Sequence, residues 1–166
     1  EIVVLIGTSH SIQLGKNSSD LFKEVLLDEC RSNRVQAIAE EIQVGAETVA
    51  LEVTQELNIS HLYADPDLDE RRTAGIETYI ERNLMEKYGD EYPEICLWPR
   101  EPSNENLPHV VWKEYCSRTN AAYRAREEFW LSRINRLNQW PLLFICGADH
   151  FDEFAKLLVR DGKDVV

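Results

Sequence analysis

Several features that would assign this chain to a class of protein are missing from its sequence. Its four cysteines have neither Cys-x-x-Cys spacing nor the framework of a small secreted domain, so we expect free thiols in a reducing cytoplasm. No signal-peptide core and no apolar run of about 20 residues is present, which argues against a membrane protein. The phosphate-binding Gly-x-Gly-x-x-Gly and Gly-x-x-x-x-Gly-Lys-Ser/Thr patterns and the Gly-x-Ser-x-Gly nucleophile elbow are also absent.

Positive charge is scarce. The chain has 18 lysines and arginines against 30 aspartates and glutamates, for a net charge of -12. Such a balance repels phosphate backbones and anionic lipid surfaces at long range. We therefore expect neither nucleic acid nor a membrane as a general partner, and a small molecule or a peptide as the substrate. Nothing in the sequence indicates an oligomeric state.

The chain has enough apolar residues to fold without disulfides or a structural metal. Its 166 residues are 43% hydrophobic and include four tryptophans, which predicts a single domain over residues 1–166. The only methionine is Met85, and residues 163–166 are typical of the start of a strand. We therefore expect the natural chain to extend beyond Glu1 and Val166.

Short apolar runs alternate with longer stretches of helical spacing. The predicted strands are Ile2–Ile6, Val35–Ala39, Ile59–Ala64 and Leu142–Cys146. The predicted helices cover Leu21–Cys30, Val49–Leu57, Ile76–Leu84, Val110–Leu137 with a break near Thr119, and Phe151–Leu158. This alternation predicts an α/β fold in which helices flank a mostly parallel central sheet.

One pattern occurs twice, each time directly after a predicted strand. Gly7-Thr8-Ser9-His10 follows the first strand, and Gly147-Ala148-Asp149-His150 follows the last. Open α/β sheets bind ligands at the carboxyl ends of their strands. If these two strands are parallel neighbours, about 4.8 Å apart, His10 and His150 meet in one crevice. Two converging imidazoles indicate a metal site or an acid/base site.

Two glutamates, Glu40 and Glu41, follow the second predicted strand. A strand covered on both faces has no solvated side, so carboxylates at its end are expected in a polar crevice. Two imidazoles and one carboxylate form an open ligand set for catalytic Zn²⁺ that also suits Mn²⁺ or Fe²⁺. The alternative is a solvated turn. Either glutamate could face the crevice, because a register change of one residue exchanges them.

Arg126 lies on a predicted helix with a stripe of Tyr123, Arg126 or Glu127, Trp130, Ile134 and Leu137, which is apolar except at its Arg/Glu step. A buried arginine needs a partner, and its planar fork suits a carboxylate or a developing oxyanion. The alternative is a surface pair with Trp130 packed beneath the arginine stem.

Three further residues are weaker candidates. Asp65 ends the third predicted strand beside Pro66 and could reach the crevice, although Asp-Pro-Asp favours a turn. His61 near the start of the third strand is expected at the opposite end of the sheet. Asp149 is a candidate acceptor that orients His150.

In chain order, the two Gly-x-x-His motifs, a glutamate after the second strand and Arg126 before the last strand resemble the Tiki/TraB superfamily. That superfamily includes erythromycin-esterase-like and ChaN-like proteins. The resemblance implies an α/β fold with both histidines and the glutamate in one pocket. Tiki-type members are metal-dependent proteases, esterase-like members hydrolyse a lactone, and ChaN-like members bind haem. This chain is short for the group, and has Glu40-Glu41 where one glutamate is usual.

These observations predict a hydrolase acting on an ester, lactone or amide. In the metal-dependent form, His10, His150 and Glu40 or Glu41 hold a divalent ion, Zn or Mn, and Arg126 stabilises the charged intermediate. Without a metal, His10 is the general base and the glutamate orients it. The alternative is a non-catalytic protein that uses the same histidines to bind haem or a small ligand.

Overall fold

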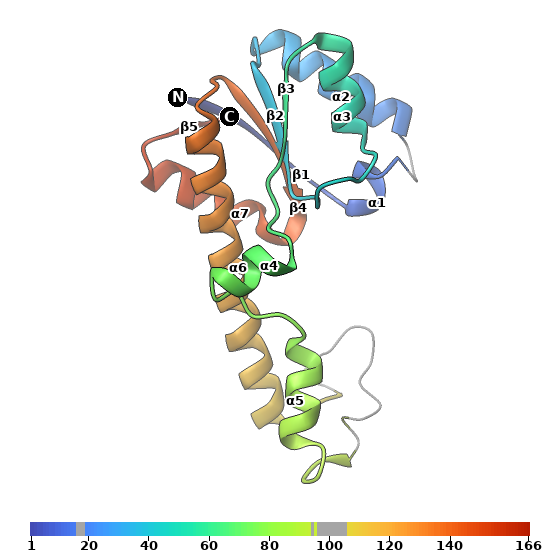
Figure 1. Ribbon diagram of the computed structural model, residues 1–166, viewed down its shortest axis with the longest axis vertical. Coiled ribbons are helices and arrows are strands. Elements are labelled where there is room, and N and C mark those ends of the chain that lie inside the picture. Colours follow the sequence, from blue (N-terminus) through green and yellow to red (C-terminus); the bar gives the residue numbers. More distant parts are fainter. Residues whose placement is uncertain (16–18, 94, 96–105) are drawn as a thin grey trace. The chain divides into compact units, whose positions relative to one another are not determined.

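The computed structural model describes residues 1–15, 19–93, 95 and 106–166. These residues group into two compact units (Figure 1). The first contains Glu1–Asp67 and Arg126–Val166, and the second contains Leu68–Ala125. Every candidate site residue predicted from the sequence belongs to the first unit.

The described part of the first unit is built on a five-stranded parallel sheet, which confirms the α/β fold class. The strands are β1 (Ile2–Thr8), β2 (Ala37–Glu40), β3 (Ser60–Tyr63), β4 (Leu142–Gly147) and β5 (Asp164–Val165), in the order β3-β2-β4-β1-β5. β1 pairs with β4 from Val3 opposite Leu142 to Thr8 opposite Gly147. The two strands that carry the Gly-x-x-His motifs are therefore parallel neighbours, as predicted.

Helices cover both faces of this sheet. α2 (Ser19–Ser32) and α3 (Val49–Leu57) lie on one side, and α7 (Ala148–Arg160) lies on the other (Figure 1). Alternate strand residues supply the two cores. The core on the α2/α3 side includes Val4, Ile38, Leu143 and Ile145. The core on the α7 side includes Leu5, Ala39, Phe144, Phe154, and Trp130 from the carboxyl-terminal part of α6 (His109–Leu137).

Several helix boundaries differ from the sequence prediction. α6 is continuous through Thr119, where a break was expected. A short helix, α1 (His10–Gln13), follows β1 directly and was not predicted. α5 (Ile80–Tyr88) begins four residues later than Ile76, because Tyr79 adopts a left-handed conformation (φ 59°) that helical backbone does not allow.

The second unit consists of α4 (Leu68–Thr73), α5 and the first part of α6. Its small apolar core contains Ile80, Leu84 and Ala122. An ion pair between Glu77 and Arg118 adds to the contacts within this unit, and it lowers the pKa of the Glu77 carboxyl.

Cys30, Cys116 and Cys146 carry free thiols, and Cys96 lies outside the described residues. Across the described ranges, the helices include none with both the length and the apolar character needed to cross a bilayer.

Candidate functional site

The carboxyl ends of three neighbouring strands bring the predicted site residues together. His10 lies two residues beyond β1, Glu41 directly follows β2, and His150 lies in the first turn of α7, which begins where β4 ends. β2, β4 and β1 are consecutive in the sheet. Arg126 reaches the same edge from α6. The structure thus assembles four of the five predicted residues into one cluster.

Glu41 is the centre of this cluster. Its side chain is 2% exposed, and its Oε2 accepts a hydrogen bond of 2.7 Å from the backbone N–H of Gly147. Gly147 is the N-cap of α7, so the carboxylate lies at the positive end of the helix dipole. A Cβ on residue 147 would come within 3.2 Å of this oxygen. The glycine therefore permits the close approach of the carboxylate to the backbone.

The other carboxylate oxygen of Glu41 faces both imidazoles. Its Oε1 lies 3.7 Å from His10 Nε2 and 3.5 Å from His150 Nε2. The two histidines differ in exposure, because the His10 side chain is 56% exposed and the His150 side chain only 4%. His10 is therefore the imidazole that solvent and a substrate can reach.

Arg126 is turned into the cluster, where it binds two carboxylates. Its Nη2 donates to Glu41 Oε1 at 2.6 Å and to Asp65 Oδ1 at 2.8 Å, and its Nε donates to Asp65 Oδ1 at 2.9 Å. Burial disfavours the charged guanidinium, but attraction to Asp65 and then Glu41 outweighs this cost and raises the pKa of Arg126. The Trp130 ring also lies near the guanidinium, 5.3 Å from its central carbon. The arginine is thus a fixed cation inside the site.

The sequence favoured a turn for Asp65 and assigned no partner to Glu127. Asp65 was assigned to a turn, but it is 4% exposed and also accepts a hydrogen bond from Trp130 Nε1 at 3.2 Å. Glu127 is 4% exposed, and its Oε1 lies 2.7 Å from His150 Nδ1, the position that the sequence offered to Asp149. Helical spacing had placed Glu127, as the alternative to Arg126, on the stripe with Trp130, but it did not identify His150 as its partner.

Glu40 points away from the cluster, although the sequence kept it as a candidate beside Glu41. Its Oε1 accepts a hydrogen bond of 2.6 Å from Thr48 and lies 2.7 Å from His61 Nε2. Consecutive strand residues project to opposite faces, so Glu40 follows Ile38 toward α2 and α3 while Glu41 follows Ala39 toward α6 and α7. His61 is packed against Glu40 and takes no part in the strand-end cluster.

The donor atoms of the cluster can be compared with the geometry that a divalent ion needs. Ligands about 2.0–2.2 Å from one ion lie roughly 3–3.5 Å apart, and the separations from Glu41 Oε1 to the two imidazoles are near this range. However, Arg126 already donates to that oxygen and lies 3.4 Å from His150 Nε2. Among the described residues, no group of three His, Cys, Asp or Glu side chains is arranged to hold a metal. As arranged, the donors do not fit an ion, because the guanidinium fills the cationic position.

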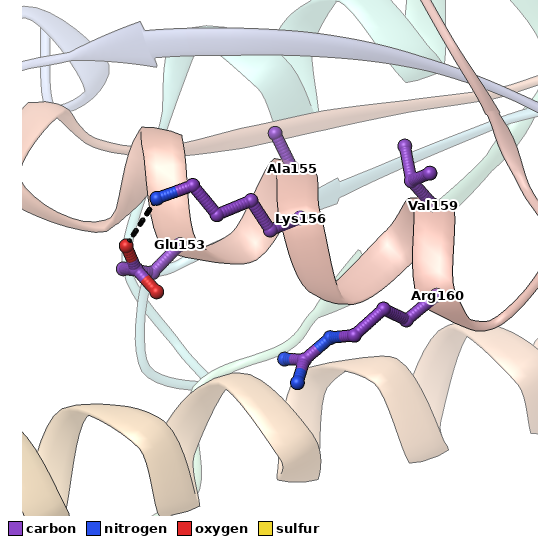
Figure 2. Close-up of a pocket in the computed structure, with 5 residues that line it drawn as sticks. All are labelled: Glu153, Ala155, Lys156, Val159 and Arg160. Carbon is purple, nitrogen blue, oxygen red and sulfur yellow. Dashed lines mark hydrogen bonds and ion pairs between the residues drawn. The ribbon is translucent and has the colours of Figure 1, made fainter.

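Two surface hollows lie away from this cluster. One, of about 580 Å³, runs along α7 and is lined by Ala155, Val159 and the charged side chains around them (Figure 2). The other, of about 640 Å³, lies near the amino ends of the strands and is lined by residues that include Asn58 and Asn138. Neither hollow contains a residue of the strand-end cluster.

Comparisons with protein-family models, with curated proteins and with solved structures found no match for this chain. The functional argument therefore depends on the geometry of the cluster itself.

Proposed function

We propose that the first unit is a hydrolase that acts on the carbonyl group of an ester, a lactone or an amide. The observation that carries this proposal is the convergence of His10 and His150 on one oxygen of Glu41, which Arg126 holds in place. An exposed imidazole next to a buried carboxylate and a fixed cation provides a base and electrostatic stabilisation in one place.

In the proposed mechanism, His10 acts as the general base. Its Nε2 faces Glu41, so its Nδ1 is the nitrogen that takes a proton from an attacking water molecule. The Glu41 carboxylate stabilises the imidazolium that forms. Attack on the carbonyl carbon places negative charge on the carbonyl oxygen, and the Arg126 guanidinium stabilises that charge. The imidazolium then returns the proton to the leaving group as the tetrahedral intermediate collapses.

The charges in the cluster favour a neutral carbonyl substrate over a phosphate ester. Three buried carboxylates, Glu41, Asp65 and Glu127, belong to the cluster that holds the Arg126 guanidinium. Two of them, Glu41 and Asp65, already bind the guanidinium and offset its positive charge, which disfavours a phosphate group. The charge that develops on a carbonyl oxygen during attack is smaller and arises only at the transition state.

The resemblance to the Tiki/TraB superfamily agrees with the proposed hydrolase function. The likeness is inferred from the paired Gly-x-x-His motifs, the glutamate after the second strand and Arg126, and the esterase-like members offer the nearest chemistry. A bound Zn²⁺ or Mn²⁺ remains a prediction. Binding it in the usual geometry requires Arg126 to move off Glu41, and the metal content of protein purified without a histidine tag tests this.

The test is hydrolysis of a defined substrate panel by the purified chain. The panel contains p-nitrophenyl acetate and butyrate, γ- and δ-lactones followed by pH indicator, and a peptide p-nitroanilide. We expect turnover of at least one substrate, and a loss of about 100-fold or more in kcat for His10→Ala, because general bases contribute about 10²–10⁴-fold. His109→Ala, which removes an exposed histidine of the second unit, is the matched control.

Two results would contradict the hydrolase proposal. One is a wild-type chain that turns over no member of the panel, with or without added Zn²⁺ or Mn²⁺. The other is equal activity of the His10→Ala and His109→Ala variants. An absorbance scan of the same preparation shows whether haem is bound instead.

A further inference from the structure

The imidazole of His150 is held at both of its nitrogens. Its Nδ1 lies 2.7 Å from Glu127 Oε1, and its Nε2 lies 3.4 Å from Arg126 Nη1. The ring also packs edge-on against Trp130, with the ring centres 4.8 Å apart. The side chains of His150 and Glu127 are 4% and 5% exposed, so water has little access to either contact.

The contacts to Glu127 and Arg126 favour one tautomer of the neutral ring. A guanidinium only donates hydrogen bonds, so the nitrogen that faces Arg126 must accept with its lone pair. The ring proton then lies on Nδ1, where it donates to the Glu127 carboxylate. Glu41 Oε1 lies 3.5 Å from Nε2, but this oxygen already accepts from Arg126 at 2.6 Å, so the shorter contact to Glu127 decides the proton position.

We propose that Glu127 is a positioning residue that keeps the proton of His150 on Nδ1 and so directs the Nε2 lone pair at Arg126. This inference rests on the hydrolase function proposed above, in which Arg126 stabilises the developing negative charge. If the proton moved to Nε2, two N–H donors would face each other at 3.4 Å. The guanidinium would then turn away from His150 and lose one of the contacts that fix its orientation.

Neighbouring residues of one helical turn perform the two tasks. Arg126 and Glu127 are consecutive in α6, where successive side chains are about 100° apart around the helix axis. Arg126 supplies the cation, and Glu127 sets the acceptor on α7 that this cation faces. A carboxylate that orients an imidazole through Nδ1 is a known way to fix both the tautomer and the ring orientation.

The direct test is nitrogen-15 NMR of histidine-labelled protein, which identifies the protonated ring nitrogen. In the wild type we expect His150 to carry its proton on Nδ1. Glu127→Leu removes the acceptor, so the Nε2-protonated form should become populated. Glu127→Gln keeps a carbonyl acceptor of the same shape, so it should retain the Nδ1 proton with a weaker hydrogen bond. Glu128→Gln, at the exposed neighbouring position, should leave the spectrum unchanged.

The inference is overturned if His150 is protonated on Nε2 in the wild type. It is also overturned if Glu127→Leu has the same His150 tautomer as the wild type. If Glu127→Leu does not fold, an unchanged Nδ1 resonance in Glu127→Gln overturns it. On a turned-over substrate, we expect Glu127→Leu to lower kcat/KM by about 10- to 100-fold and Glu127→Gln to restore part of it.

The failure of this inference is distinguishable from the failure of the proposed function. A wild type that hydrolyses nothing but shows the expected tautomer changes contradicts the hydrolase and leaves the role of Glu127 in place. An active wild type whose His150 tautomer does not respond to residue 127 contradicts the positioning role alone.

Discussion

Removal of the Arg126 guanidinium should destabilise the first unit strongly. Its partners Glu41 and Asp65 have side chains only 2% and 5% exposed, so Arg126→Ala removes a cation that binds two buried carboxylates. Breaking a buried pair in this way costs about 3–5 kcal/mol. The arginine is itself 14% exposed, and water can enter the space it leaves, so we expect a loss near the lower end, about 3 kcal/mol.

The assay is urea unfolding followed by circular dichroism. Tryptophan fluorescence is avoided, because removal of Arg126 changes the surroundings of Trp130 directly. Arg124→Ala, at an exposed position on the same helix, is the control and should change stability by less than about 0.5 kcal/mol. Asp65→Asn should be destabilising alone but should recover stability when added to Arg126→Ala, because it removes one of the two buried negative charges that Arg126 binds. A loss in Arg126→Ala no larger than in Arg124→Ala would refute the buried ion cluster.

Three further predictions concern the core and the thiols. Phe154→Ala, which empties a fully buried position under the sheet, should cost about 3–5 kcal/mol, whereas Val159→Ala at an exposed site of α7 should cost little; chemical denaturation measures both. Thiol labelling mapped by mass spectrometry at pH 8 should modify Cys116 before Cys30 and Cys146, since burial raises the pKa of Cys30 to about 11 and that of Cys146 to about 12. The folded chain holds the Cys146 proton more tightly than the unfolded chain, so its contribution to the free energy of unfolding is present below pH 9 and is lost as the pH rises toward 12. The loss of stability over this pH range should be smaller in Cys146→Ala.

The strand arrangement could be predicted because it depends on local apolar patterns. β1 and β4 are short, mostly apolar runs, and the predicted strands 2–6 and 142–146 mark them closely. Their placement side by side brought His10 and His150 to one edge, which the duplicated Gly-x-x-His motif had suggested. Local pattern and sheet topology therefore agreed for the two histidines.

The choice between Glu40 and Glu41 could not be made from the sequence. Because β2 is buried on both faces, its residues show no apolar alternation that would identify the side facing the site. Tertiary packing decides the matter, since α6 and α7 cover the face to which Ala39 and Glu41 belong. Glu41 and Glu40 are adjacent in the sequence, but Glu41 faces the site whereas Glu40 accepts a hydrogen bond from Thr48 on the other face of the sheet.

Asp65 and Glu127 were hidden for a different reason. Each is a common surface residue type, and each becomes buried only because a cation or an imidazole lies within hydrogen-bond distance. Such pairs join residues 61 and 23 positions apart along the chain. Sequence spacing on α6 placed Glu127 on a buried stripe, but its partner became known only from the fold.

The most direct test of the account compares the two adjacent glutamates on one hydrolysed substrate. Glu41→Gln and Glu40→Gln are measured at equal concentrations of folded protein, so that any difference in stability is removed. The account predicts a loss of about 100-fold or more in kcat for Glu41→Gln and a value close to wild type for Glu40→Gln, because only Glu41 faces His10 and Arg126. Equal losses in both variants, or full activity in Glu41→Gln, would contradict the assignment of the site.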